Sequence, residues 1–152
     1  MDDESINKSS MRKRSLAREY ALIILYQKDV TAQDVDHKVR QFWEETEATH
    51  AEVKEFANRL VYGVNRELEE IDKKIAYYAT NWQLKRMATI DRNILRLGVF
   101  EFFYAPDIPP KVTINEAVEL AKKFGDMESS KFVNGILDKI HKTEVVLLKE
   151  QK

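Results

Sequence analysis

The segment Met87–Tyr104, MATIDRNILRLGVFEFFY, constrains the fold of this chain more than any other stretch. Its apolar residues form two rows with the three- and four-residue spacing of an α-helix. One row holds Ile90, Ile94 and Leu97, and the other holds Leu95, Val99 and Phe102. A helix that is apolar around most of its circumference must be covered by other elements. The sequence therefore predicts a buried central helix inside an all-α fold.

Five polar residues interrupt this apolar surface, and we expect them to line a narrow strip that is open to solvent. They are Asp91, Arg92, Asn93, Arg96 and Glu101. Gly98 costs the helix about 1 kcal/mol relative to alanine, which suggests that another backbone comes close there. Ala105 precedes Pro106, and a residue before proline is driven out of the helical conformation, so the helix ends here.

The other amphipathic stretches bring the total to about seven helices, packed as two helical-bundle lobes around the central one. These stretches cover residues 15–28, 31–43, 53–64, 68–78, 113–125 and 129–140, approximately. We interpret residues 1–10 as a flexible polar tail and residues 11–152 as a single domain. Its lobes are expected at about 11–80 and 81–145, with Trp82 packed between them.

Two local motifs refine the ends of the later helices. Thr113 and Glu116 have the T-x-x-E spacing of a capping box, in which each side chain satisfies a free N–H of the first turn. Gly125 suits the position just after a helix, and Ser129 or Ser130 is expected to cap the next one. Asn134-Gly135 could form a hairpin turn, but the spacing of the surrounding apolar residues favours a helix.

Composition describes a globular chain without disulfides. It has 152 residues, of which 43% are hydrophobic and 34% charged, values typical of a folded domain. The absence of cysteine excludes disulfides, a thiol nucleophile and a cysteine-ligated metal. The N-terminus is polar, and no apolar run approaches the length of a membrane span. We therefore expect a cytoplasmic protein.

Charge is distributed unevenly although the net charge is only −1. Residues 8–18 contain five basic residues and no acid, whereas residues 44–72 contain nine acids and three bases. Cations at the start of a helix oppose its dipole, so Arg12, Lys13 and Arg14 break a local rule, and such breaks often mark function. The alternative is a solubilising tail.

Signals for catalysis are weak, and we predict no enzyme activity, no cofactor and no metal. The three histidines are scattered without metal-ligand spacing, and no phosphate-binding loop or nucleophile motif occurs. A helical body with a basic segment suits RNA, which binds cations through phosphates and aromatics through unpaired bases. Tyr26 and Phe132 are the candidates for stacking, with a place in the core as the alternative for each.

Four strings together resemble the NusB family of bacterial transcription antitermination factors. They are Ala17-Arg18-Glu19 with Leu25-Tyr26, Trp82-x-Leu84-x-x-Met87 leading into IDRNILRL at 90–97, INEAVELAK at 114–122, and SKFVNGILDKI at 130–140. The resemblance extends from about residue 12 to residue 141. A related module forms the N-terminal part of some ribosomal-RNA cytosine methyltransferases, but we expect the free-standing factor here.

The resemblance implies a helical protein that catalyses no reaction and binds single-stranded boxA RNA in nascent ribosomal-RNA transcripts. It implies as partners the ribosomal protein NusE, and NusA, NusG and RNA polymerase in the larger complex. Some relatives form homodimers, so a monomer and a weak homodimer both stay open. The alternatives to an antitermination factor are a protein-interaction module with incidental RNA contact, and a free-standing relative of the RNA-binding part of a ribosomal-RNA cytosine methyltransferase.

The resemblance also implies two groups of site residues. For RNA they are Arg12, Lys13, Arg14, Arg18, Tyr26, Glu128, Ser129, Ser130, Lys131 and Phe132. Backbone N–H groups at the start of the last helix would suit a phosphate. For the NusE surface they are Tyr26, Trp82, Asp91 and Arg92, where the acid at Asp91 would suit a basic ribosomal protein.

Overall fold

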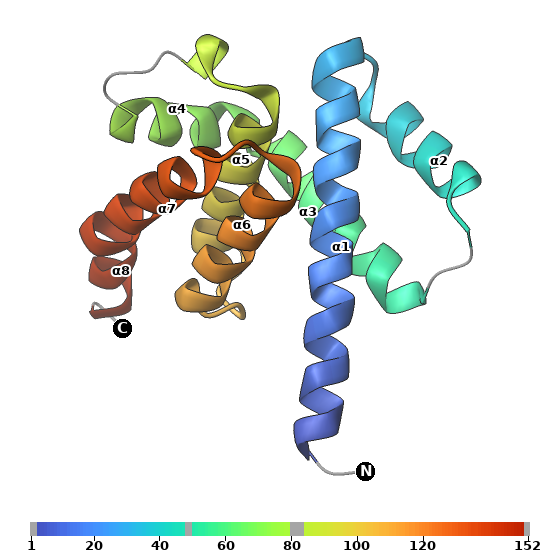
Figure 1. Cartoon of the computed structure of the whole chain (residues 1–152), viewed down its shortest axis with the longest axis horizontal. Helices are drawn as coiled ribbons and strands as arrows, with labels where there is room; N and C mark the ends of the chain where they lie inside the picture. Colours follow the sequence, from blue (N-terminus) through green and yellow to red (C-terminus); the bar gives the residue numbers. More distant parts are fainter. Residues whose placement is uncertain (1–2, 48–49, 80–83, 151–152) are drawn as a thin grey trace. The chain divides into compact units, whose positions relative to one another are not determined.

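The computed structural model describes residues 3–47, 50–79 and 84–150, and across these residues the chain is all helical, which confirms the predicted fold class. Before the central helix lie α1 (Asp3–Thr31), α2 (Val35–Glu45), α3 (Ala51–Arg66), α4 (Leu68–Tyr78) and a 3₁₀ turn, η1 (Leu84–Arg86). Then follow α5 (Thr89–Tyr104), α6 (Pro110–Phe124), α7 (Ser129–Ile140), a π-helical turn η2 (His141–Val145) and α8 (Val146–Glu150), as Figure 1 shows.

The chain divides into two compact units, residues 1–65 and 66–152, and each is described by itself. The first unit holds α1, α2 and α3, and the second holds everything from α4 onward. The predicted lobes instead met at about residue 80. The two boundaries differ by α4, which belongs with the second unit because it packs against α5 and α7. Trp82 lies outside the described residues.

Helix α1 begins about twelve residues earlier than predicted, so residues 3–10, expected as a flexible tail, are helical. No glycine or proline occurs between residues 3 and 31, and polarity alone does not stop a helix. Arg12, Lys13 and Arg14 therefore lie within the helix instead of at its start. The predicted conflict with the helix dipole does not exist, because the dipole acts within the first and last turns.

Helix α5 is the buried central helix that its sequence predicted. Ile94, Leu95 and Val99 are fully buried, and α4, α6 and α7 all pack against this helix, as Figure 1 shows. None of the helices in the described ranges combines the length and apolar character needed to cross a bilayer.

The polar residues of α5 do not line a solvated strip, and that prediction is wrong. Arg96 is buried and donates two hydrogen bonds of 2.8 Å, from Nε and Nη2, to the carboxylate of Asp72 on α4. Glu101 is 2% exposed and accepts a hydrogen bond of 2.8 Å from Thr113 on α6. The polar atoms of a buried helix thus find partners on the neighbouring helices, which fixes how those helices pack.

Gly98 is required by close approach, but a side chain and not a backbone comes near. A Cβ atom at this position would lie 2.9 Å from both terminal methyl groups of Leu137 on α7. The glycine therefore lets α7 pack closely on α5.

The start of α6 differs from the predicted motif, whereas its end just before Gly125 and the helix through Asn134-Gly135 are as predicted. Helix α6 begins at Pro110, which fits the first turn because it has no N–H to satisfy. Thr113 lies inside the helix and bonds to Glu101, so it forms no capping box. Asn134 and Gly135 lie within α7, which excludes the hairpin turn.

Candidate nucleic-acid interface

The basic segment of the first unit lies on α1. Arg12 is exposed and forms no ion pair with any residue that the structure describes. Lys13 Nζ lies 3.2 Å from a carboxylate oxygen of the exposed Glu52 on α3. An exposed pair of this kind contributes little to stability and opens at small cost, so Lys13 can exchange Glu52 for another anion.

The guanidinium groups of this unit gather around one aromatic ring. The Cζ atoms of Arg14, Arg18 and Arg59 lie 4.5, 5.3 and 5.9 Å from the ring centre of Phe56. Such contacts hold a guanidinium in place through the negative face of the ring. Arg18 is only 2% exposed, so it is a buried member of the cluster. Arg14 is partly exposed.

Arg59 was missed by the sequence analysis because it lies in the acidic stretch 44–72. Its spacing of three residues from Phe56 on α3 was the available signal.

Tyr26 is 39% exposed on α1. The aromatic contacts of this unit are made by Tyr20, Phe42 and Trp43, whose ring centres lie 4.8–5.8 Å apart. Tyr26 is thus an accessible aromatic residue, as a stacking or partner-binding role requires.

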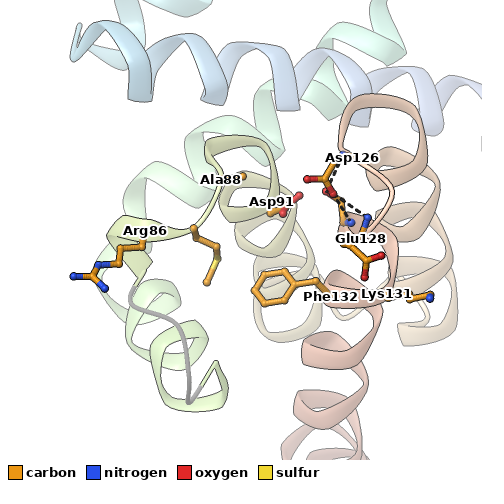
Figure 2. A pocket seen from close by; sticks show the side chains of 9 residues that line it. Arg86, Ala88, Asp91, Asp126, Glu128, Lys131 and Phe132 are labelled. Atoms are coloured by element: carbon orange, nitrogen blue, oxygen red, sulfur yellow. Dashed lines mark hydrogen bonds between the residues drawn. The ribbon is translucent and has the colours of Figure 1, made fainter.

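The second unit contains a cavity of about 650 Å³ between the start of α5 and the start of α7 (Figure 2). From the α5 side it is lined by Arg86, Met87, Ala88 and Asp91, and from the α7 side by Asp126, Glu128, Ser129, Lys131 and Phe132. Five of these residues were predicted site residues, but they had been assigned to two different surfaces. Here Asp91 shares one cavity with Glu128, Ser129, Lys131 and Phe132.

A reciprocal capping box forms the α7 wall of the cavity. Asp126 Oδ1 accepts hydrogen bonds from the backbone N–H groups of Glu128, at 2.9 Å, and Ser129, at 3.0 Å. Ser129 Oγ accepts in turn from the backbone N–H of Asp126, at 3.0 Å. These two N–H groups are therefore occupied by Asp126, and a phosphate at this helix start would have to displace its carboxylate.

Asp91 is the buried acid of this cavity. It is 8% exposed, and its Oδ1 has no hydrogen-bond partner among the described residues. Burial raises the pKa of this carboxyl group, Ser129 opposes the rise by hydrogen bonding, and the charge of Asp126 adds to it. Leaving such an atom unpaired costs free energy, so Asp91 is poised to accept a hydrogen bond from something outside the chain.

Two further predicted site residues of the second unit, Arg92 and Ser130, do not line this cavity. Arg92 donates a hydrogen bond of 3.2 Å to the carbonyl of Leu84 and so holds the 3₁₀ turn against α5. Ser130 is partly exposed and does not line this cavity, and Trp82 lies outside the described residues. The sequence analysis missed Arg86, Met87 and Asp126 as cavity residues, because nothing in their local patterns shows that α5 and α7 begin side by side.

The cavity combines an aromatic ring, an apolar methionine, two cations and three acids, of which Asp91 is buried. A flat ring can stack on Phe132, and Arg86 and Lys131 can hold phosphates. Lys131 forms no ion pair with any described residue, so its charge is available. No cluster of metal ligands occurs among the described residues.

The comparisons with known proteins agree with each other. The model of the NusB family matches residues 15–142. The transcription antitermination protein NusB of Thermodesulfovibrio yellowstonii is 45% identical over 142 residues, which cover 88% of this chain and 94% of that protein.

Solved structures are also similar. NusB from T. maritima has a TM-score of 0.81 and 36% identity, covering 91% of this chain and 97% of that one. A chain from the structure of the antitermination factors NusB and NusE in complex with dsRNA has a TM-score of 0.80 and 33% identity. It covers 87% of this chain and 98% of that one.

Proposed function

Because the chain belongs to the NusB family, we propose that it is a transcription antitermination factor that binds RNA together with NusE. Its RNA is single-stranded and carries a boxA-like sequence in nascent ribosomal-RNA transcripts. With NusE, NusA and NusG it assembles on RNA polymerase in the cytoplasm. The similar structure that contains NusE and RNA supports the two principal partners.

The observation that carries the proposal is the cavity between α5 and α7. Phe132 lines it as the aromatic platform, and Lys131 beside it has no competing ion pair among the described residues. Arg86 lines the cavity from the α5 side. An unpaired base can stack on the ring while the two cations hold its neighbouring phosphates, and stacking on one aromatic is worth roughly 1–3 kcal/mol per base.

The basic segment of α1 adds a second RNA-binding surface. Arg12 and Arg14 are accessible, and among the described residues Lys13 pairs only with the exposed Glu52. Arg18 and Arg59 keep the guanidinium cluster in place on the ring of Phe56. Phosphates bound by this segment contribute affinity without sequence preference.

Asp91 is the residue that we propose for contact with NusE, with Tyr26, Trp82 and Arg92 in the same role. Its Oδ1 lacks a partner among the described residues, and a lysine or arginine of a basic protein would satisfy it.

The test is binding of a boxA-like RNA and of a scrambled RNA of the same composition, each with and without NusE. We expect the boxA-like strand to bind more tightly, and NusE to increase the difference. Phe132→Ala should weaken binding about 5- to 160-fold, the equivalent of one lost stack. Tyr77→Ala is the matched control, because Tyr77 is 75% exposed and does not line the cavity.

The same measurements test the alternative function, a protein-interaction module. Equal and negligible binding of both strands, with NusE bound normally, would make the protein an interaction module. Loss of cooperative unfolding in Phe132→Ala would assign that residue to the core instead of the RNA site.

A further inference from the structure

A second hollow of about 380 Å³ lies between α6 and α7 and adjoins the cavity already described, because Lys131 lines both. Asn115, Glu119 and Lys122 line it from α6, and Ser130 and Asn134 line it from α7. Asn115 and Lys122 are seven residues apart, two helical turns along the same face of α6.

The polar side chains of this groove have unused hydrogen-bonding capacity. Asn115, Ser130 and Asn134 form no side-chain hydrogen bond with any part of the chain that the structure describes. Lys122 forms an exposed pair with Glu119 at 3.6 Å, a contact that water screens strongly. The groove thus offers amides and cations at its surface, with Val118 as its apolar member.

The exposed face of α7 is built from residues that weaken a helix. Asparagine competes with the backbone for hydrogen bonds, and glycine has the greatest freedom to lose on folding. A Cβ atom at Gly135 would meet nothing within 4 Å, so packing inside the chain does not require the glycine there. Gly135 lies one turn after Lys131 on the same face. Residues that weaken a helix, and that no packing inside the chain requires, indicate that a binding partner contacts this face of the helix.

We propose that the groove between α6 and α7 binds the ribose–phosphate backbone of single-stranded RNA that continues from the Phe132 cavity. Lys122 and Lys131 hold successive phosphates, the amides of Asn115 and Asn134 bond to 2′-hydroxyl groups, and the missing side chain of Gly135 lets the strand lie close to the helix. Charge complementarity favours a nucleic acid over a protein, because the groove's two lysines outnumber its one acid, Glu119, and two amides lie beside them. This inference rests on the proposed function and extends it by giving the ribose its own contacts.

The first experiment compares an RNA with the 2′-deoxy strand of the same base sequence, using deoxyuridine for uridine. Asn115→Ala and Asn134→Ala should each weaken RNA binding about 2- to 10-fold, as expected for one lost hydrogen bond. Binding of the deoxy strand should change much less, since the 2′-hydroxyl distinguishes the two strands. Equal losses for both strands would overturn the assignment of the amides to the ribose.

The second experiment measures salt dependence with a matched pair of lysines. Lys122→Ala should reduce the magnitude of the negative slope of log affinity against log salt by about 0.7, the value for one single-strand phosphate contact. Lys139→Ala is the control, because Lys139 is exposed on α7 and lines neither hollow. If Lys122→Ala and the unchanged protein show the same slope, Lys122 does not bind a phosphate.

The third experiment uses Gly135→Ala, which separates folding from binding. Alanine improves the helix and meets no neighbour, so the Tm should rise by about 2–4 °C. The added methyl group should nevertheless weaken RNA binding, because it stands where the strand approaches the helix. A higher Tm with unchanged affinity would show that nothing binds over Gly135.

The outcomes keep the inference apart from the proposed function. If the unchanged protein with NusE fails to bind RNA, the proposed function fails. If it binds RNA but the groove variants bind equally well, only the groove assignment fails. If the variants weaken binding of NusE and leave RNA binding intact, the groove is a protein contact and the inference is wrong.

Discussion

Asp91 differs from the other buried polar residues of α5 at the scale of the single residue. Arg96 and Glu101 each bond to a side chain of a neighbouring helix, whereas Asp91 Oδ1 has no partner among the described residues. Burial raises the pKa of Asp91, so the folded protein holds this proton more tightly than the unfolded chain does. The charged form therefore opposes folding at neutral pH.

Asp91→Asn should raise the free energy of unfolding at pH 7 by about 1 kcal/mol, because it removes a buried charge and keeps the shape. The carboxyl group of Asp91, whose pKa is raised, contributes stability at low pH. This contribution is lost as pH rises through the pKa of the folded state. The gain of the variant should therefore shrink as pH falls toward 3.8, the ordinary pKa of an aspartate carboxyl group.

Urea unfolding at several pH values checks this prediction, and Glu128→Gln is the control at the same cavity. Glu128 is exposed, so its variant should leave stability nearly unchanged at every pH. If Asp91→Asn destabilises the protein at pH 7, the prediction is wrong and the charged form of Asp91 stabilises the native state. The same variant should weaken binding of NusE if Asp91 forms the proposed contact.

Residue-level prediction from sequence succeeded where local pattern carries the information. The spacing of Ile94 and Leu97 was enough to place them inside the molecule, and both are buried. It failed for Arg96 and Glu101, which look solvent-facing on a helical wheel, because their partners lie 24 and 12 residues away. The sequence pattern also could not show that Asp91 and Phe132 line one cavity.

At the scale of elements, the C-terminal π-helical turn is held to α4 by one carboxylate. Glu144 accepts a hydrogen bond of 2.7 Å from Lys74 and one of 2.5 Å from the hydroxyl of Tyr78. Burial alone would raise the pKa of Glu144, but these hydrogen bonds and the charge of Lys74 outweigh it and lower the pKa. Burial and the bond to Glu144 raise the pKa of Tyr78 to about 12.

Tyr78→Phe should lower the free energy of unfolding by about 1 kcal/mol at pH 7, a value reduced for partial exposure. A lowered carboxyl pKa gives stability that is present above its unfolded value of 4.5 and is lost as pH falls through the folded value. The raised tyrosine pKa gives stability that is lost as pH rises toward 12.

The difference between the two proteins should therefore be largest between these limits, which a series of urea titrations measures. Tyr77→Phe is the control, since its hydroxyl bonds to no described residue and Tyr77 is 75% exposed. A difference of the same size at pH 3 would contradict the link to Glu144.

Helix positions followed from the sequence more reliably than helix ends did. The start of α7 shows why, because Ser129, one of the two serines expected to cap it, shares a reciprocal capping box with Asp126, which had not been predicted. Several short motifs satisfy the same local rule, and only the packing of the whole unit selects one. At Gly125 a Cβ atom would lie 2.8 Å from the carbonyl oxygen of Ala121 and would also contact Ser129, so the turn depends on glycine.

At the scale of the whole molecule, a net charge of −1 gives no hint of an RNA partner. The distribution of charge does, because Arg12 and Arg14 belong to a stretch without acids. The local field and not the total charge governs attraction to a polyanion.

Replacing Arg12 and Arg14 together by alanine should reduce the magnitude of the negative slope of log affinity against log salt by about 1.4, from two phosphate contacts of about 0.7 each. Titrations of one RNA at several salt concentrations measure it. Lys111→Ala with Lys139→Ala is the control for loss of two charges, because both lysines are exposed on the second unit. An unchanged slope in the arginine variant would make the basic segment a solubilising surface.

The continuity of α1 from Asp3 to Thr31 has a consequence for the entropy change on RNA binding. Cations on a preformed helix hold fixed angular positions, about 100° apart per residue, before any transcript arrives. A disordered basic arm would have to become ordered on contact, at a cost of about 1–2 kcal/mol for each residue that is fixed. Here that entropy is lost during folding, so encounter with RNA should leave the helix content of the protein unchanged.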